Sequence, residues 1–412
     1  MKANNNTPAI RFAGYTAPWE RRKLGDLASI LGGYAWKSSD YHKDGDYLVV
    51  TIANVTGDVQ IRTDIGNRIN CPNPGAYRLN ENDILISLTG NVGRVSRVPN
   101  VNAVLNQRVA KLCPDTRVTD KFLFQTIRNP KFEQAMLDAG QGAAQKNISN
   151  SDVLGYEVGV PIEAEQHKLG QVFEQIESLV TLHQRKYEKL VNLKNAMLDK
   201  MFPKNGELVP EVRFAGFSGN WERRKLGEIV NRVVRKNTDN ASSLALTISA
   251  QHGLVDQGNY FNNRVASQDV SNYYLIRKGE FAYNKSSSDG SPFGVVKRLD
   301  LYDMGVLSTL YIVFEIKDPN SVNTDYLSVF FDTNRWHKEV STRASEGARN
   351  HGLLNISATD FLDIEINVPR EYDEQEKLGE FFMKLAHLID RYEQGLMSLR
   401  NLKSAFLDKM FV

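Results

Sequence analysis

The chain has 412 residues, more than one ordinary domain of about 150, and this length predicts two or three compact units. Hydrophobic residues make up 41% and aromatic residues 9% of the sequence, which excludes a wholly disordered or collagen-like chain. The net charge is +2, from 51 Lys and Arg against 49 Asp and Glu. This charge excludes a protein that binds DNA through a large excess of positive charge, as histones do, but not a protein that reads DNA with local basic surfaces.

The two cysteines, Cys71 and Cys113, are too few for a disulfide framework or a Cys-based zinc site, which fits a reducing cytoplasm. The first twelve residues, MKANNNTPAIRF, lack the apolar region of a signal peptide. No segment approaches the roughly 18 to 20 apolar residues needed to span a bilayer. We therefore expect a cytoplasmic protein without a membrane partner.

The first recognisable segment is RFAGYTAPWERRKLGDL at 11–27, and it returns as RFAGFSGNWERRKLGEI at 213–229 with 11 of 17 positions identical. KNISNSDVLGYEVGVP at 146–161 is answered by LNISATDFLDIEINVP at 354–369, and residues 166–202 match 375–411 at 16 of 37 positions. The chain is therefore a tandem repeat. Between these segments the two halves share little, because either they hold different inserts or duplicated domains have simply drifted.

Inside the first half, residues 46–56 and 82–89 are rich in β-branched residues, are bounded by turn residues, and predict strands. Residues 279–284 and 306–316 predict strands in the second half. Helical patterns occur at 119–138 and 323–342. Each half is thus predicted to contain a mixed α+β domain with a largely antiparallel sheet.

Each half ends in a long heptad pattern, which predicts two coiled-coil helices of about 38 residues and roughly 57 Å. Helix pairing is predicted for Leu169, Phe173, Ile176, Val180, Tyr187, Leu190, Leu378, Phe382, Leu385, Ile389, Leu396 and Leu399. Antiparallel pairing of the two helices is the simplest way to bury both stripes. Alternatively, each helix packs on its own domain or pairs between two chains. Lys194 and Lys403 interrupt the stripes, either to fix the register or as snorkelling lysines at a bundle end.

The predicted fold is therefore α+β, with two tandem mixed α/β domains separated by two long antiparallel coiled-coil helices in a pseudo-two-fold arrangement. The predicted divisions are a first domain at 1–162, a central helix at 163–202, a second domain at 203–370 and a C-terminal helix at 371–412. The first domain carries a net charge of +4 and the second carries 0. Phosphate neutralisation alone would thus give weak, salt-sensitive DNA binding.

Catalytic and metal motifs are missing from the sequence. There is no Gly-x-x-x-x-Gly-Lys phosphate loop, no Asn-Pro-Pro-aromatic or Asp-Pro-Pro-aromatic methyltransferase motif, and no nuclease motif in which Glu-x-Lys follows a Pro-Asp pair. The seven histidines show no metal-ligand spacing. We expect no catalytic residue, no metal site and no cofactor on this chain.

The order of these segments resembles the specificity subunit of Type I restriction-modification systems. The resemblance rests on the tandem halves, the RFAGF-like and WERRKLG segments, the NIS segment, and Glu-Gln-x-x-Leu-Gly at 165–170 and 374–379, which begins a helix that closes with LDKMF. It covers nearly the whole chain. It implies two target recognition domains, each reading one half of a split site in double-stranded DNA, with conserved helices that set the gap.

The resemblance also implies two methyltransferase (modification) subunits that use S-adenosylmethionine, and restriction (motor and nuclease) subunits that use ATP. This chain would be the non-catalytic reader and scaffold. A coiled-coil adaptor without intrinsic DNA specificity and a standalone enzyme are the alternatives.

Polar turns within each domain are the candidate DNA contacts, because Arg, Lys, Asn, Gln and Ser read base edges in the major groove. For each of them an ordinary solvated loop is the alternative. The doubled ERRK at 20–23 and 222–225 is the same in both halves, so we interpret it as a structural helix start or a partner surface. The candidates are Lys37, Ser38, Asn91, Arg94, Arg97, Gln107, Arg108, Gln145 and Lys146 in the first domain, and Lys236, Asn284, Lys285, Ser286, Ser287, Arg343, Arg349, Asn350 and His351 in the second.

Overall fold

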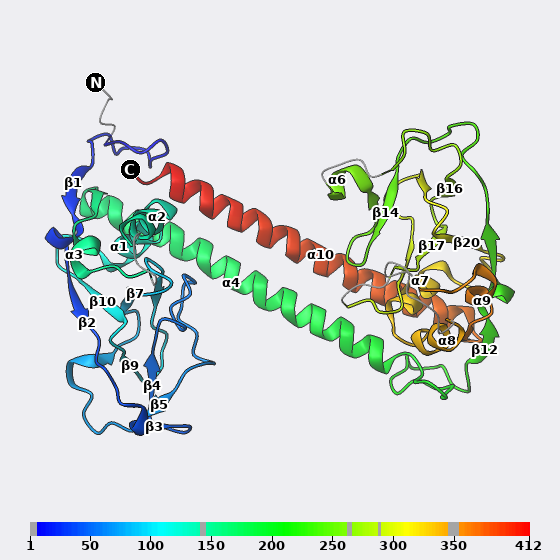
Figure 1. The fold of residues 1–412 in the computed structure, drawn as a ribbon, viewed down its shortest axis with the longest axis horizontal. Helices are drawn as coiled ribbons and strands as arrows, with labels where there is room; N and C mark the ends of the chain where they lie inside the picture. Colours follow the sequence, from blue (N-terminus) through cyan, green and yellow to red (C-terminus); the bar gives the residue numbers. More distant parts are fainter. Residues whose placement is uncertain (1–5, 141–145, 262–265, 287–289, 345–353) are drawn as a thin grey trace. The chain divides into compact units, whose positions relative to one another are not determined.

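The computed structural model describes residues 6–140, 146–261, 266–286, 290–344 and 354–412. The chain forms two compact units (Figure 1): the first contains Met1–Arg185 and Glu393–Val412, and the second contains Lys186–Tyr392. Each of the two long helices therefore contributes one part to each unit.

The first unit contains a four-stranded sheet of order β2-β10-β7-β8, a five-stranded sheet of order β3-β5-β4-β9-β6, and the pair β1-β11. Among these pairs of described strands, only β4 and β9 run parallel. The strands are β1 (Glu20–Lys23), β2 (Ala28–Gly32), β3 (Tyr41–His42), β4 (Tyr47–Val50), β5 (Arg68–Ile69), β6 (Arg78–Leu79), β7 (Ile84–Ser87), β8 (Val95–Arg97), β9 (Ala103–Leu105), β10 (Val109–Pro114) and β11 (Glu157–Val160). The short helices are η1 (Leu24–Asp26), η2 (Ser38–Asp40), η3 (Gly75–Tyr77), α1 (Asp120–Ile127), α2 (Pro130–Ala139) and α3 (Asn150–Leu154).

The second unit repeats this plan with a four-stranded sheet of order β13-β20-β17-β18 and the pair β12-β21, together with the pairs β14-β15 and β16-β19. Its strands are β12 (Glu222–Lys225), β13 (Val230–Val233), β14 (Leu246–Ser249), β15 (Gly253–Asp256), β16 (Tyr274–Arg277), β17 (Phe281–Asn284), β18 (Val295–Arg298), β19 (Met304–Leu307), β20 (Ile312–Ile316) and β21 (Glu365–Val368). Its short helices are α5 (Leu226–Ile229), α6 (Gln257–Phe261), α7 (Thr324–Asp332), α8 (His337–Arg343) and α9 (Ala358–Leu362).

The long helices are α4 (Glu163–Lys200) and α10 (Tyr372–Lys409), each of 38 residues. They pack antiparallel within each unit. In the first unit Glu177 accepts a hydrogen bond from Lys403 and Gln184 from Arg400, so the residue number rises along α4 as it falls along α10. In the second unit the Lys186 ammonium lies 5.6 Å from the centre of the Tyr392 ring. The predicted antiparallel helices are thus confirmed.

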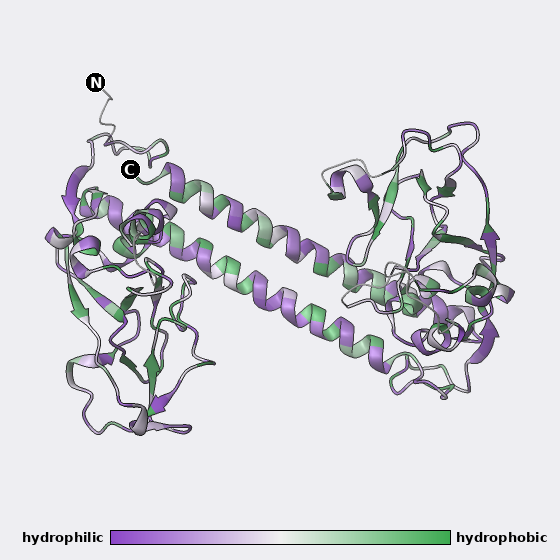
Figure 2. Cartoon of the chain, in the orientation of Figure 1, coloured by the Kyte–Doolittle hydropathy of each residue, from purple (hydrophilic) through white to green (hydrophobic). Residues whose placement is uncertain are grey.

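All twelve residues predicted to pair the helices are buried or half-buried. Green apolar segments alternate with purple polar ones along both helices in Figure 2, as expected for a helix with one covered face. The first turns of each helix also pack in the core of the domain that precedes them, where Leu169 and Phe173, and likewise Leu378 and Phe382, are almost fully covered. Each long helix therefore packs on its own domain and also pairs with the other long helix.

The opening of each long helix is held by the same side chains in both units. Arg11 donates two hydrogen bonds of 2.7 Å to the buried carboxylate of Glu165, and Arg213 donates two of 2.7 Å to Glu374. The hydrogen bond to Glu165 raises the pKa of Arg11 above its ordinary value. The repeated RFAG and Glu-Gln segments therefore supply the two partners of one structural ion pair. Its hydrogen bonds are charge-assisted and bidentate, which makes them stronger than hydrogen bonds between neutral groups.

Three predicted elements are interrupted. The segment 119–138 is two helices, because Asn129 caps α2 and Pro130 stands at its first position. The segment 323–342 is likewise α7 and α8, and the segment 306–316 is β19 and β20 separated by a turn. Hydrophobic periodicity does not detect a break when the residues on either side of it are equally apolar.

The chain closes on itself in the first unit. The backbone N–H of Ile10 donates to the carbonyl of Lys409 at 2.9 Å, and that of Val212 donates to the carbonyl of Lys200 at 2.9 Å in the second unit. The last turn of α10 therefore accepts a backbone hydrogen bond from the N-terminal segment, just as the last turn of α4 accepts one from the segment that follows it.

We expect a circularly permuted chain to fold. Joining Val412 directly to Met1 places 12 residues between Lys409 and Ile10, against the 11 between Lys200 and Val212. Opening the chain between Asn205 and Gly206 should then cost little, because both residues are exposed in a surface turn. Thermal unfolding of the permuted chain should give a Tm within a few degrees of the parent. Loss of the cooperative transition would contradict the equivalence of the two junctions.

Candidate nucleic-acid interface

Four of the predicted polar turns of the first domain lie together, and we call them the first rim: residues 34–38, 88–91, 106–108 and 146–147. Backbone hydrogen bonds connect them in series. The N–H of Gln107 donates to the carbonyl of Tyr34 at 3.0 Å, that of Leu88 to Arg108 at 3.2 Å, and that of Gly90 to Lys146 at 2.9 Å. Tertiary pairing thus brings segments that are far apart in the sequence to one edge of the four-stranded sheet.

The first rim presents exposed polar side chains. Among the described residues, Gln107 and Arg108 have no side-chain hydrogen-bond or ion-pair partner, and Lys37, Asn91 and Lys146 are exposed as well. A Gln amide can make two hydrogen bonds to adenine and an Arg guanidinium two to guanine, whereas Lys side chains suit phosphates. The turn before β10 therefore offers two side chains of the types that read bases.

An aromatic cluster that the sequence reasoning missed supports this turn. The Tyr34 ring, 45% exposed, lies 4.8 Å from Trp36 and 5.3 Å from Tyr77 between ring centres. The indole N–H of Trp36 donates to the carbonyl of Leu105 at 3.0 Å. The signal in the sequence was the spacing of the aromatic residues in GYAWKSS, directly before the predicted Lys37 and Ser38.

Two predicted contacts of the first domain are arginines that contact other groups of the domain. Arg97 is buried in β8, where its guanidinium carbon lies 4.4 Å from the centre of the Phe124 ring and burial lowers its pKa. Arg94 is half-buried, with its Nε 3.7 Å from a carboxylate oxygen of Glu133. Arg97 therefore lies outside the first rim, because β8 places it against Phe124 of α1. All three residues of β8 are buried, so the strand lacks the two-residue alternation that would show from the sequence which side chains face outward.

Segments of the second unit form an equivalent edge, which we call the second rim: residues 236, 284–286, 308–310 and 354. The N–H of Leu354 donates to the carbonyl of Lys285 at 2.9 Å. The Lys236 ammonium donates to the carbonyl of Asn272 at 2.8 Å and lies 4.2 Å from the Tyr274 ring centre, while Tyr274 pairs with Leu307 at the end of β19. Lys236, Asn284, Lys285 and Ser286 thus lie along one edge, as their first-domain counterparts do.

The turn at 308–310 was missed because 306–316 was predicted as one strand. Ser308 was the available signal in the sequence, because serine is a typical turn residue. In the structure its side-chain oxygen accepts a hydrogen bond from the N–H of Leu310 at 3.4 Å. Five predicted contacts lie outside the described residues: Gln145, Ser287, Arg349, Asn350 and His351.

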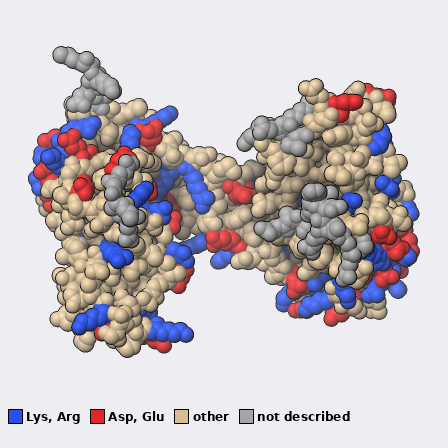
Figure 3. All heavy atoms as spheres, in the orientation of Figure 1, with Lys and Arg blue, Asp and Glu red and all other residues tan. Residues whose placement is uncertain are grey.

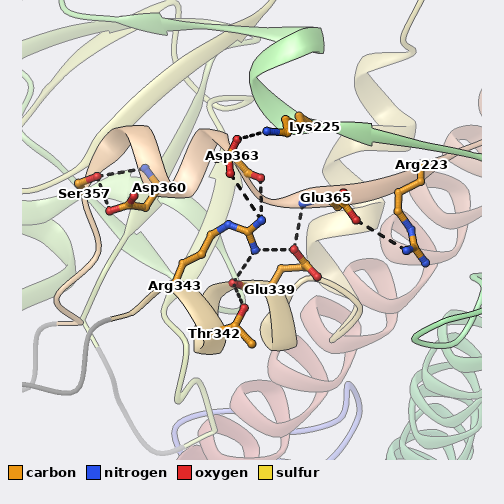
Figure 4. A network of polar contacts seen from close by, with 9 residues as sticks. All are labelled: Arg223, Lys225, Glu339, Thr342, Arg343, Ser357, Asp360, Asp363 and Glu365. Atoms are coloured by element: carbon orange, nitrogen blue, oxygen red, sulfur yellow. Dashed lines mark hydrogen bonds and ion pairs between the residues drawn. The ribbon is translucent and has the colours of Figure 1, made fainter.

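Arg343 belongs to a polar network rather than to the second rim (Figure 4). Its guanidinium donates to Glu339 at 2.6 Å and to the backbone carbonyl of Asp363 at 3.0 Å, which ties α8 to the segment before β21. Lys225 donates to the Asp363 carboxylate at 2.6 Å and holds the pKa of Asp363 below its ordinary value. The charge of Arg343 is compensated within the domain, so its prediction as a DNA contact is not supported.

The repeated ERRK segments form β1 and β12, which pair antiparallel with β11 and β21. The prediction of a helix start is wrong by a few residues, because the short helices η1 and α5 begin only after Lys23 and Lys225. Arg223 lies 3.7 Å from Glu365 across the pair β12-β21 (Figure 4). These strand pairs occur in both units, and we call the set of elements that recurs in both units the frame.

Charges of both signs are interspersed on the face of the molecule that Figure 3 shows. No single large basic patch dominates that face, which agrees with the net charge of +2. An arrangement of this kind leaves recognition to the particular side chains of each rim.

Three observations on known proteins bear on this arrangement. The family model of the Type I restriction modification DNA specificity domain matches residues 17–192. The Type I restriction enzyme EcoBI specificity subunit from Escherichia coli is 25% identical over 142 residues, a match that spans 33% of this chain and 30% of that protein. The crystal structure of a Type I restriction-modification system S subunit from M. genitalium is similar with a TM-score of 0.67 and 16% sequence identity, covering 98% of this chain and 99% of that one.

Residues 17–192 therefore carry a DNA specificity domain of the Type I restriction-modification class. The chain as a whole has the fold of the S subunits of these systems. The resemblance found in the sequence is thus confirmed. Within the described part of the chain, no cluster of His, Cys, Asp and Glu is suited to hold a metal ion, and no helix is long and apolar enough to cross a membrane.

Proposed function

We propose that this chain is the DNA sequence-specificity subunit of a Type I restriction-modification complex, in which each unit reads one half of a bipartite site. One observation carries the proposal: two units with equivalent four-stranded sheets present rims of different chemistry at the same edge. The frame repeats Arg11 and Glu165 as Arg213 and Glu374, whereas the turn before the sheet's inner strand is Gln107-Arg108 in one unit and Thr309-Leu310 in the other. An adaptor without DNA specificity has no need of two different rims on one frame.

The remaining roles belong to partners in this proposal. Two methyltransferase subunits bring S-adenosylmethionine and transfer the methyl group, restriction subunits bring ATP hydrolysis and cleavage, and this chain takes no catalytic part. The helices α4 and α10 scaffold the methyltransferase subunits and set the length of the unread gap. Their 38 residues correspond to about 57 Å, more than one turn of B-DNA.

The test is methylation by the full chain together with its methyltransferase partners. We expect modified adenines to fall within one split sequence, mapped by long-read sequencing of cells with and without this chain. Binding of the complex to that sequence should exceed binding to a scrambled duplex at high salt, where contacts to phosphate alone are weak. Modification without sequence preference would contradict the proposal. Methyl transfer by this chain alone would instead support the alternative that the chain is a standalone enzyme.

The spacer role predicts that helix length controls the gap. A heptad inserted after Arg185 in α4 and another after Tyr392 in α10 keep each apolar face in phase and lengthen both helices by about 10 Å. The unread gap should grow by about three base pairs, because B-DNA rises about 3.4 Å per pair. The methylated motif should show this directly, with both half-sites unchanged. An unchanged gap in a complex that still methylates would refute the spacer role.

A further inference from the structure

We propose that Leu310 is a specificity-determining residue of the second rim, and that it contacts the 5-methyl group of a thymine in the major groove. The inference rests on the proposed function and adds to it the base class that this position reads. It starts from an exposed leucine that no packing in the described residues explains: Leu310 is 56% exposed, between Leu307 and Ile312, which are nearly fully buried.

Strand register makes Leu310 the counterpart of Arg108. In the first unit Leu112 of β10 pairs with Ile84 of β7, and in the second Phe314 of β20 pairs with Phe281 of β17. Ile84 and Phe281 both pair with the arginine that ends the next strand, Arg97 and Arg298. Counting back four residues from Leu112 and from Phe314 gives Arg108 and Leu310, so the same place in the frame carries a guanidinium in one unit and an isobutyl group in the other.

The turn that carries Leu310 is held on both sides. The N–H of Tyr311 donates to the carbonyl of Ser308 at 3.1 Å, and the Ser308 side chain accepts from the N–H of Leu310 at 3.4 Å. The Tyr311 hydroxyl lies 3.5 Å from the hydroxyl of Thr247. A side chain on a turn fixed in this way meets a ligand with little further loss of conformational freedom.

Polar neighbours place this leucine within a DNA-reading edge rather than in a purely apolar patch. Asn284 and Lys285 follow Tyr283, which pairs with Ile312, so they leave β17 where the chain from Leu310 enters β20. Thr309, also exposed, precedes Leu310. An apolar side chain among hydrogen-bonding ones matches the major-groove edge of an A·T pair, where the thymine methyl lies beside an acceptor oxygen and the adenine amino group.

Removal of single methyl groups from the DNA tests the contact. Once the methylated motif is known, duplexes are made in which each thymine of the second half-site is replaced in turn by uracil, which lacks only the methyl. They compete for binding to the complex of the full chain with its methyltransferase subunits. One replacement should weaken binding by the wild type about fourfold, the value of one buried methyl group, and should leave binding by Leu310→Ala unchanged.

Two further variants complete the design. Leu301→Ala removes another exposed leucine of the same unit, at the opposite end of β19 and 62% exposed, and should keep the full uracil effect. Leu310→Arg copies the first rim and should shift the preferred base at that one position toward guanine, with the first half-site unchanged. The thermal unfolding of each variant confirms its fold.

The outcomes separate this inference from the proposed function. Absence of any sequence preference in the wild-type complex contradicts the proposed function itself. Specific binding with no uracil effect, a half-site without thymine, or a uracil effect that persists unchanged in Leu310→Ala overturns the role of Leu310 alone. A loss of methyltransferase binding in Leu310→Ala, with no change in base preference, would instead make the leucine a protein contact and would also overturn it.

Discussion

Replacing Phe411 by alanine is expected to lower the free energy of unfolding of the first unit by about 3–5 kcal/mol, the range for a buried phenylalanine. The Phe411 ring centre lies 5.7 Å from that of Phe122, 6.2 Å from Trp19 and 5.5 Å from Phe173. Phe411 is the residue before the last, yet it fills the core on which β1, α1 and α4 meet. Chemical denaturation with hydrogen exchange followed by mass spectrometry measures the loss and locates it.

Phe202 offers a matched variant in the second unit, because it lies 5.9 Å from Trp221, 5.9 Å from Tyr326 and 6.0 Å from Phe382. Phe202→Ala should destabilise that unit by a similar amount and leave the first unit protected from exchange. Met397→Ala, at an exposed site on α10, should change stability by less than about 0.5 kcal/mol. Equal effects of all three variants would contradict the assignment of these cores.

Replacing Glu177 by alanine is expected to cost the first unit about 3–5 kcal/mol, because it leaves buried positive charge without its counter-ion. Glu177 accepts hydrogen bonds from Arg128 and, at 2.8 Å, from Lys403, and all three side chains are less than one-fifth exposed. Denaturation of Glu177→Ala measures the cost. Glu380→Ala removes an exposed partner of Lys384 on α10 and should leave the denaturation curve nearly unchanged, because exposed ion pairs contribute little to stability.

The same lysine predicts a dependence on pH. Burial, together with the nearby charge of Arg128, lowers the pKa of Lys403 below its ordinary value. The folded chain therefore holds this proton less tightly than the unfolded chain, so stability should rise with pH from the folded pKa up to the unfolded value of 10.5. Lys403→Met should remove this rise. An identical pH profile in wild type and variant would contradict the burial of this charge.

In the second unit the equivalent lysine, Lys194, has a different partner. Lys194 donates to Asp332 at 3.0 Å, and Lys297 donates to Asp332 at 2.7 Å. Burial alone would raise the pKa of Asp332, but the two lysines hold it below its ordinary value. Lys194 and Lys403, which interrupt the heptad stripes, are therefore not snorkelling lysines at a bundle end. Each is neutralised by a carboxylate from a different element, an interaction that a heptad pattern does not show.

The organisation of the chain followed from the sequence alone. Repetition of RFAG, WERRKLG, the Glu-Gln segment and LDKMF predicted two copies of one frame, and heptad periodicity predicted the two helices to within a few residues. These signals are local or periodic, and each is written in consecutive residues. Arg11 and Glu165 could be recognised as recurring, but that they bond each other could not, because their pairing spans 154 residues.

Tertiary structure alone decided which polar turns lie together and which side chains face outward. Hydrogen bonds between distant strands assemble Tyr34, Gly90, Gln107 and Lys146 into one rim, whereas Arg97, of the same residue type as Arg108, is buried against Phe124. A single β-turn at Ser308 exposes Leu310 within a stretch that reads as a continuous strand. The physical reason is that strand register and turn geometry depend on long-range pairing, while composition and periodicity report only on neighbours along the chain.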